Sequence, residues 1–448
     1  MQIKITLRAK LMKKNEIIRL AIPNIISNVT IPLLGMIDLA IVGHMGDKSY
    51  IGAVAIGTTI FNFIYWNFGF LRMGTSGFAA QAYGKRDFSD TMLVLARSVL
   101  VGFTISVALI LCQHPIGKLA FFFIKPSETV APLAWKYFSI LIWAAPATLE
   151  LYSLKGWFIG MQNSKTPMVI AILINVLNIC FSLLFVYAFG MTIEGVAWGS
   201  VLAQYSGLAL AIFMLNKNYK KLFPRLRLKK VFLMQEMLKF FSVNGNIFLR
   251  TLCMIAVFTF FTSASSRMGD TLLAVNTLLM QLFMLFSYIM DGFAYAAEAL
   301  AGKYFGAKNL LLLKRTIKDL MKWGVVLSLI FTVLYLLFGS QILAILTNEK
   351  EVLAVAKDYI WWVLPVPLVG FSAFLWDGIF IGTSAAKAMR NAIFVATAIF
   401  FTVFYTLYPH LGIHALWIAF LSFLLLRGIL QQIQAKRELY DKITPSAS

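Results

Sequence analysis

The sequence predicts an all-α integral membrane protein in which twelve transmembrane helices form two six-helix lobes related by a parallel internal repeat. Three observations lead to this prediction. The 448 residues are 60% hydrophobic and 13% charged, with a mean hydropathy of +0.80, whereas a soluble domain is roughly half apolar and about a quarter charged. Apolar runs long enough to cross a bilayer recur along the chain, and its two halves share short strings at a nearly constant offset.

Each apolar run can form a transmembrane helix, because about 20 residues span a hydrocarbon core of roughly 30 Å. The first run contains Pro23, Pro32 and Asp38 and has no small-residue cleavage site, so we interpret it as a helix and not as a signal peptide. The twelve runs lie at 20–43, 51–75, 91–113, 128–151, 167–189, 193–215, 239–266, 271–301, 320–346, 352–382, 389–409 and 411–432. We expect a cytoplasmic N-terminal segment at 1–19, an N-terminal lobe at 20–215, a cytoplasmic basic connector at 216–238, a C-terminal lobe at 239–432 and a cytoplasmic tail at 433–448.

The basic residues fall mainly in alternate gaps between the runs. With both termini on one side, 31 of the 40 Lys and Arg residues lie on that side and seven on the other. Because cytoplasmic loops carry the excess of Lys and Arg, both termini are expected in the cytoplasm. The net charge of +21 therefore indicates membrane-surface loops and no nucleic-acid partner. We expect a multi-pass protein of the bacterial inner (cytoplasmic) membrane.

The internal repeat is visible in two pairs of strings. Residues 156–160 (GWFIG) resemble 378–382 (GIFIG), and residues 81–84 (QAYG) resemble 303–306 (KYFG), both at an offset of 222. Since each half has six spans, both halves begin on the same side of the membrane, which makes the repeats parallel. Two repeated lobes with a cavity at the membrane midplane favour alternating access, which neither a channel nor an anchored enzyme requires.

Sequence signatures of enzymes are missing. The chain has no Gly-x-Gly-x-x-Gly, Walker, Gly-x-Ser-x-Gly or His-Glu-x-x-His sequence. We therefore expect no enzyme and no cofactor, and uphill transport would use an ion gradient. His410 and His414 have the spacing of a metal pair, but Gly412 lies between them and no third ligand is near in sequence, so we assign no metal.

Polar residues inside the spans of the first half are candidates for a transport site. Asp38 is the strongest, because an ionised Asp at a helix centre costs about 2.5–3.5 kcal/mol on insertion scales. Asn178 and Ser182 share a helix face at four-residue spacing. Such side chains are either ligands or hydrogen-bond partners between helices, and the sequence leaves both open. Three further polar positions are Asn175, Ser200 and Gln204.

The second half carries Arg250, Asp291, Glu298 and Asp377 inside its spans. Asp291 and Glu298 are seven residues apart and hence on one helix face. Because charges inside a membrane usually pair, Arg250 can simply neutralise one of these carboxylates. The alternatives are contact with substrate or relay of protons.

The chain resembles the multidrug and toxic compound extrusion (MATE) transporters and, within them, the DinF-like branch. The resemblance covers nearly the whole chain, and its Asp-Gly-Phe-Ala-Tyr and Asp-Gly-Ile-Phe-Ile-Gly strings are specific to that branch. It rests on the strings at 22–25 (IPNI), 38–43 (DLAIVG), 70–77 (FLRMGTSG), 80–84 (AQAYG), 175–179 (NVLNI), 274–276 (AVN), 291–295 (DGFAY) with Glu298, 377–382 (DGIFIG) and 389–391 (MRN).

The resemblance implies an antiporter that exports amphipathic, often cationic compounds in exchange for H⁺ or Na⁺. Its ion site would contain Asp38, Asn178 and Ser200, and Pro23 matches the proline at which the first helix is proposed to bend. Relatives commonly have Asp where this chain has Ser182. Because Na⁺ favours several oxygen ligands and a compensating charge, loss of that carboxylate favours proton coupling. A NorM-like Glu is also missing from the seventh span, which offers Asn246 and Arg250 instead.

These observations together predict a proton-coupled multidrug exporter that works by alternating access. Its partners would be lipophilic or cationic small molecules, H⁺ and the lipid bilayer, and we expect a monomer. The alternatives are coupling to Na⁺, or a flippase for a lipid-linked oligosaccharide or another lipid precursor.

Overall fold

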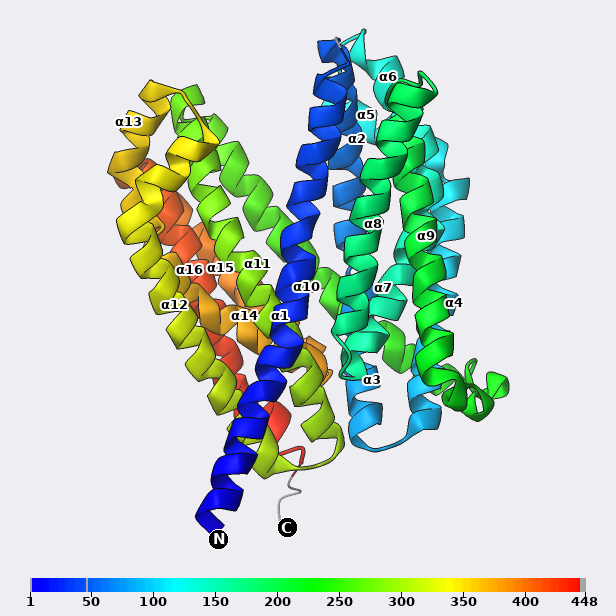
Figure 1. Cartoon of the computed structure of the whole chain (residues 1–448). Helices are drawn as coiled ribbons and strands as arrows, with labels where there is room; N and C mark the ends of the chain where they lie inside the picture. The colour runs from blue at the N-terminus through cyan, green and yellow to red at the C-terminus, as the bar shows by residue number, and fades with distance from the viewer. Residues whose placement is uncertain (1, 46, 444–448) are drawn as a thin grey trace. The chain divides into compact units, whose positions relative to one another are not determined.

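The computed structural model describes residues 2–45 and 47–443 as a set of helices, with no strand in either range (Figure 1). Eleven helices are long and apolar enough to cross a membrane, and a twelfth span forms if the bent pair at Lys350–Trp362 and Val366–Gly382 counts as one. Each of these spans overlaps one of the twelve apolar runs. The predicted fold class is therefore confirmed.

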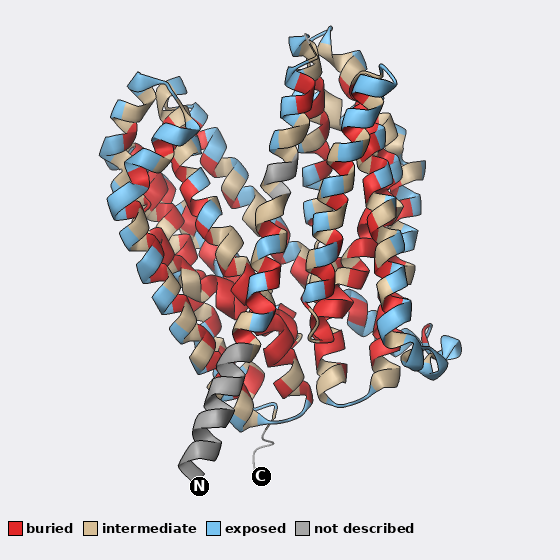
Figure 2. Cartoon of the chain, in the orientation of Figure 1, coloured by how far each residue is buried: buried red, intermediate tan, exposed pale blue. Residues whose placement is uncertain are grey.

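The helices group into two compact units. The N-terminal unit comprises Ile26–Phe241, and the C-terminal unit comprises Ser242–Ser448 together with Met1–Ile25. Within each unit, buried residues follow the inward sides of the helices (Figure 2). Large apolar side chains such as Leu111, Phe123 and Ile345 are exposed at 77%, 74% and 82%, as lipid-facing residues of a membrane helix are.

The N-terminal unit begins within α1, Gln2–Gly43. Its other α-helices are α2 Lys48–Asn67, α3 Phe70–Gly84, α4 Phe88–Leu111, α5 Gln113–Ile124, α6 Val130–Leu141, α7 Ala145–Gly160, α8 Lys165–Leu183 and α9 Ile193–Tyr219. Short segments extend three of them: the 3₁₀ turn η1 Ile142–Ala144, the π-helical η2 Leu184–Ala188 and the 3₁₀ helix η3 Lys220–Arg225. Two expected continuous runs are therefore interrupted, 51–75 near Gly69 and 128–151 just before Pro146, the N-terminal proline of α7.

The C-terminal unit repeats this arrangement. Its helices are α10 Met234–Ser266 from Ser242 onward, α11 Asp270–Gly306, α12 Leu310–Leu346, α13 Lys350–Tyr359, η5 Ile360–Trp362, α14 Val366–Gly382, α15 Ala386–Leu411, α16 Ile413–Ala435 and the π-helical η6 Lys436–Tyr440. The chain bends by 61° between η5 and α14. Pro365 and Pro367 stand at this bend, where proline supplies no backbone donor to the preceding turn.

Helix α1 contributes residues to both units. The unit boundary lies between Ile25 and Ile26, two residues after Pro23. Residues before the boundary pack on α11, where a Cβ on Gly292 would overlap the Ile25 side chain and lie 3.1 Å from the Ala21 carbonyl oxygen. The expected N-terminal lobe at 20–215 instead places the whole of this helix in one lobe, and the structure divides it.

The segment expected as a basic connector, 216–238, is attached to α4. The buried Arg97 donates from Nε to the Val231 carbonyl at 3.2 Å and from Nη2 to the Lys230 carbonyl at 2.9 Å. Ser89 donates to the Arg225 carbonyl at 2.9 Å. The sequence treats Arg97 as a loop charge, but the structure buries it to 4% exposure, because the connector's carbonyl groups satisfy its guanidinium group.

The internal repeat is preserved in helix packing. A Cβ on Gly156 of α7 would overlap the Arg72 carbonyl of α3, and a Cβ on Gly378 of α14 would overlap the Ala294 carbonyl of α11. Both the glycines and their neighbours are 222 residues apart. The same helix pair therefore meets at the same backbone positions in both halves, at a distance that only glycine allows.

Candidate functional site

Asp38 is half-buried on α1 and borders an apolar cluster of the N-terminal unit. Its neighbours Ile37 and Ile41 belong to a cluster that includes Val196 and Ala197 of α9. The Asp38 Oδ1 atom is shielded from solvent and has no hydrogen-bond partner among the described residues. A carboxylate in such surroundings is costly while it is charged, and a bound proton or cation would remove that cost.

Tyr137 of α6 is near enough to this carboxyl group to interact with it electrostatically. Its ring fits against α2 at Gly57, where a Cβ would lie 2.8 Å from the tyrosine Cε1 atom. Tyr137 is 2% exposed. The position of the phenol beside Asp38 is therefore fixed by close packing, and the sequence analysis did not identify it because it looks like an ordinary core aromatic.

Asn178 and Ser200 connect α8 to α9. The Asn178 Nδ2 atom donates to the Ser200 Oγ atom at 2.7 Å, while the Asn178 Oδ1 atom is buried with no partner among the described residues. Ser182 packs against Gly199, where a Cβ would lie 2.6 Å from the Ser182 Oγ atom. The two helices are thus close enough that the polar face of α8 borders α9 directly.

The other two predicted positions are less enclosed. Asn175 donates from Nδ2 to the Thr30 carbonyl of α1 at 3.1 Å, so α8 is joined to α1 one turn before Asn178. Gln204 is half-buried on α9, one turn after Ser200. Three helices, α1, α8 and α9, therefore contribute the polar residues of this candidate site. Its Asp38 Oδ1 and Asn178 Oδ1 atoms have no hydrogen-bond partner among the described residues.

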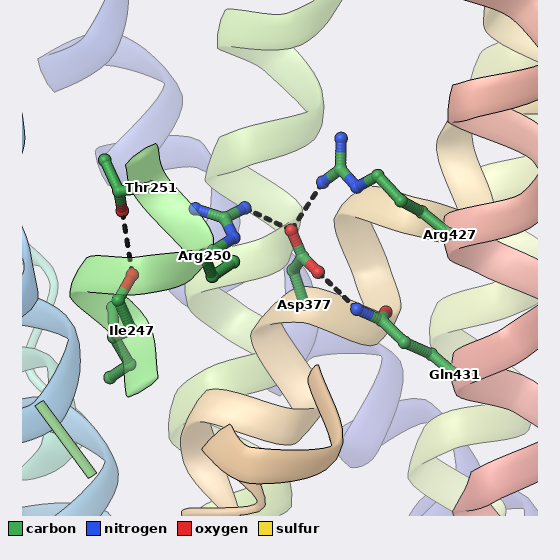
Figure 3. A network of polar contacts seen from close by, with 6 residues as sticks. All are labelled: Ile247, Arg250, Thr251, Asp377, Arg427 and Gln431. Atoms are coloured by element: carbon green, nitrogen blue, oxygen red, sulfur yellow. Dashed lines mark hydrogen bonds and ion pairs between the residues drawn. The ribbon is translucent and has the colours of Figure 1, made fainter. Parts of the chain in front are cut away.

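The C-terminal unit holds a buried ion cluster around Asp377 of α14 (Figure 3). Arg250 of α10 and Arg427 of α16 both donate from Nη2 to Asp377 Oδ2, the latter at 2.6 Å. Gln431, one turn after Arg427, donates from Nε2 to Oδ1 at 2.6 Å. Thr251, next to Arg250, bonds to its own helix at the Ile247 carbonyl. Both carboxylate oxygens of Asp377 are therefore occupied.

The cluster carries two guanidinium groups for one carboxylate. Arg427 is 1% exposed and Arg250 is 8% exposed. The sequence offered Arg250 either as a neutralising partner or as a site residue, and the ion pair with Asp377 supports the neutralising role. Arg427 and Gln431 were missed. Arg427 was counted among the cytoplasmic charges. Its position inside the apolar run 411–432 is the signal that could have identified it as a buried charge.

Asp291 and Glu298 lie on α11 of the same unit. Glu298 is 1% exposed, and its backbone packs against Gly382 of α14, where a Cβ would lie 3.0 Å from the Glu298 carbonyl carbon. Asp291 is half-buried and interacts electrostatically with Arg427. The Glu298 Oε1 atom is shielded from solvent and has no hydrogen-bond partner among the described residues. Neither Asp291 nor Glu298 is hydrogen-bonded to the Asp377 carboxylate, whose described donors are Arg250, Arg427 and Gln431.

Comparison with known proteins places this fold and these residues in a family. The MatE family model matches residues 23–184 and 247–407. The chain is 35% identical over 92% of its length, and 89% of the relative's, to the DNA damage-inducible protein F of Escherichia coli (strain K12). The chain belongs to the MatE family, the MATE membrane transporters, which are not enzymes. The resemblance seen in the sequence is confirmed.

More distant relatives and solved structures agree with the fold. The chain is 24% identical to the multidrug and toxin extrusion protein 1 of Danio rerio, over 92% of this chain and 70% of that protein. The crystal structure of a MATE protein in the bent conformation superposes with a TM-score of 0.85 at 20% identity, covering 97% of both chains. An outward-facing multidrug resistance MATE transporter superposes with a TM-score of 0.84 over 97% of both chains.

Proposed function

We propose that this transporter is a secondary active multidrug exporter that moves amphipathic, often cationic compounds outward in exchange for protons. The observation that carries the proposal is the Asp38 carboxyl group, whose Oδ1 atom is buried without a hydrogen-bond partner among the described residues. A proton and a cationic substrate are alternative ways of neutralising such a group, so their binding is competitive. Exchange of one for the other gives antiport.

The proposed cycle uses the two lobes in alternation. A proton reaches Asp38 from the outside, where the membrane potential contributes about 2.3 kcal/mol per charge for each 100 mV. The neutral carboxyl group no longer holds a cation, helix α1 rearranges near Pro23, and the substrate leaves outward. Asn178 and Ser200 supply the polar neighbours of the site, with Asn175, Ser182 and Gln204 on the same two helices.

Proton coupling is favoured over sodium coupling by the residues around Asp38. The candidate-site residues on α8 and α9 offer amide and hydroxyl groups, and the family resemblance places Ser182 where relatives commonly have a second carboxylate. Na⁺ prefers several hard oxygen ligands with a compensating charge, whereas a proton needs one carboxylate oxygen. We also propose that the protein is a monomer of the bacterial inner membrane with both termini in the cytoplasm.

The proposal is tested by efflux from proteoliposomes that contain a fluorescent lipophilic cation. A proton gradient and a sodium gradient are imposed separately, and the Asp38→Asn variant is reconstituted at the same protein density. We expect proton-driven efflux that the variant loses at least tenfold. Sodium-driven efflux, or full efflux by the variant, would contradict the proposal. Binding of phospholipid precursors in place of the dye would favour the flippase.

A further inference from the structure

Glu150 is a second buried carboxyl group in the N-terminal unit. It lies on α7 with 9% of its surface exposed. Both of its carboxylate oxygens are shielded from solvent, and neither has a hydrogen-bond partner among the described residues. Asp377 of the other unit, by contrast, has two arginines and a glutamine around it. Because an unpaired ionised carboxylate in an apolar interior is highly unfavourable, Glu150 requires a bound proton or another ligand.

The carboxyl group and a neighbouring hydroxyl group pack against the same glycine, Gly102 of α4. The point that a Cβ on Gly102 would occupy is 3.4 Å from Glu150 Oε1, 3.4 Å from Ser153 Oγ and 3.5 Å from the Leu149 carbonyl oxygen. Glu150 and Ser153 of α7 therefore both border α4 at this glycine.

A chain of hydroxyl groups begins at Ser153 and crosses three helices. Ser98 of α4 donates to Ser153 Oγ at 2.8 Å, and Thr75 of α3 donates to Ser98 Oγ at 2.5 Å. Thr75 and Ser98 are fully buried, and so is Ser153. Hydroxyl groups both donate and accept, so such a chain can pass a proton by reorienting its hydrogen bonds.

The internal repeat shows that the fold does not require these polar groups. At the offset of 222 residues, Thr75, Ser98 and Ser153 correspond to Ala297, Leu320 and Leu375, and Glu150 corresponds to Ser372. Gly102 corresponds to Gly324, which is kept because a Cβ there would lie 2.5 Å from the Phe371 ring. The three hydroxyl positions are therefore apolar in the C-terminal unit, and the carboxyl position carries only a hydroxyl group.

No titratable group near Glu150 neutralises it. Helix α7 packs against α3, α4, α8 and α9. None of the titratable side chains on these described helices or on α7 itself forms a hydrogen bond or ion pair with Glu150. These side chains are Arg72 and Tyr83 of α3, Asp90 and Arg97 of α4, Tyr152 and Lys155 of α7, Lys165 and Cys180 of α8, and Glu194, Tyr205, Lys217 and Tyr219 of α9.

We propose that Glu150 is a second proton-binding site of this transporter, and that the neighbouring hydroxyl chain Ser153, Ser98 and Thr75 passes its proton. The proton adds to a carboxylate oxygen of Glu150 and later leaves it, and no other bond changes. This inference rests on the proposed proton coupling and extends it, because two carboxyl groups in one unit allow two protons to move for each substrate.

Infrared difference spectroscopy of the purified protein tests the site without requiring transport. A pH step should reveal the carbonyl band of a protonated buried carboxylic acid, and Glu150→Gln should remove one such band. Ser98→Ala interrupts the hydroxyl chain between Thr75 and Ser153 and should slow the appearance of the band at least tenfold. Ser106→Ala is the matched control, because the Ser106 hydroxyl on the same helix bonds only to the Phe103 carbonyl at 2.7 Å.

Transport stoichiometry then tests the role of the site. In proteoliposomes the number of protons moved per substrate should fall by half in Glu150→Gln and stay unchanged in Ser106→Ala. An unchanged spectrum in Glu150→Gln would overturn the proton site, and a lost band with unchanged stoichiometry would overturn its part in coupling. If the Glu150 band is present but no proton gradient drives efflux, the proposed antiport function fails while the proton site remains.

Discussion

Asp377 illustrates at the scale of single residues how this protein tolerates charge inside a membrane segment. It accepts hydrogen bonds from two arginines on different helices and from Gln431, so three helices of one unit meet at one carboxylate. Asp38 and Glu150, on the other unit, each have buried carboxyl oxygens with no such partner among the described residues. Compensated charge is typical of a structural cluster, and uncompensated carboxyl groups are typical of proton-binding sites.

Replacing Asp377 should destabilise the C-terminal unit. Asp377→Ala leaves Arg250 and Arg427 buried without their counter-ion, which typically costs about 3–5 kcal/mol. Thermal unfolding in detergent should show a large decrease in the melting temperature. Asp319→Ala is the control, because Asp319 pairs with Lys322 at 4.0 Å across a mostly exposed lysine and such a pair contributes less than about 1 kcal/mol. Equal shifts in the two variants would contradict the structural role of the cluster.

Several residues of the candidate site could be predicted from the sequence, and others could not. A lone Asp in the first span stands out by its insertion cost, which identified Asp38. Arg427 was counted with the basic residues at the end of the last span. The sequence does not show that its side chain points toward Asp377. The hydroxyl chain beside Glu150 cannot be seen in the sequence for the same reason: Ser98 and Ser153 are 55 residues apart, and only packing brings them together.

The contact between α3 and α7, and its repeat between α11 and α14, defines the architecture at the scale of elements. Backbone carbonyls approach glycines closely at both crossings, and small residues at such interfaces let membrane helices pack tightly. The sequence predicted the repeat from these very glycines. It did not predict the breaks near Gly69 and before Pro146, because hydrophobicity continues through both, whereas helix ends depend on local backbone geometry.

Alanine at either crossing should separate the helices. Gly156→Ala and Gly378→Ala each introduce an overlap with a backbone carbonyl, and overpacking of this kind costs about 1–3 kcal/mol. We expect similar losses of stability for both, measured by thermal unfolding. Gly245→Ala on α10 is the control, since nothing lies within 4 Å of the new methyl group. A loss in only one of the two crossings would mean that the halves are not equivalent there.

Pro23 makes helix α1 easier to bend at one turn. Proline at position 23 removes a backbone donor and leaves the Arg19 carbonyl without its helical partner, which weakens the helix at that turn. Pro23→Ala should therefore stiffen α1 and slow efflux severalfold in proteoliposomes while the protein stays as stable as the wild type. Unchanged efflux would show that rearrangement at this turn does not limit transport.

The whole molecule consists of two units built from one repeated design with different interiors. The N-terminal unit keeps buried polar groups at Asp38, Asn178 and Glu150, and the C-terminal unit neutralises its central carboxylate with arginine. The fold class, the family and the repeat followed from hydrophobic runs and shared strings. The division of α1 between the units did not, because no sequence signal marks which bundle each turn of a long apolar helix contacts.

The role of Asp38 as the coupling site can be tested by measuring the protons released when substrate binds. A lipophilic cation is added to purified protein in weakly buffered detergent solution containing a pH indicator. Because proton and substrate compete for Asp38, the wild type should release protons on binding, and Asp38→Asn should release about one proton fewer per protein while it still binds the cation. Equal proton release by the two proteins would contradict the assignment of Asp38 as the coupling site.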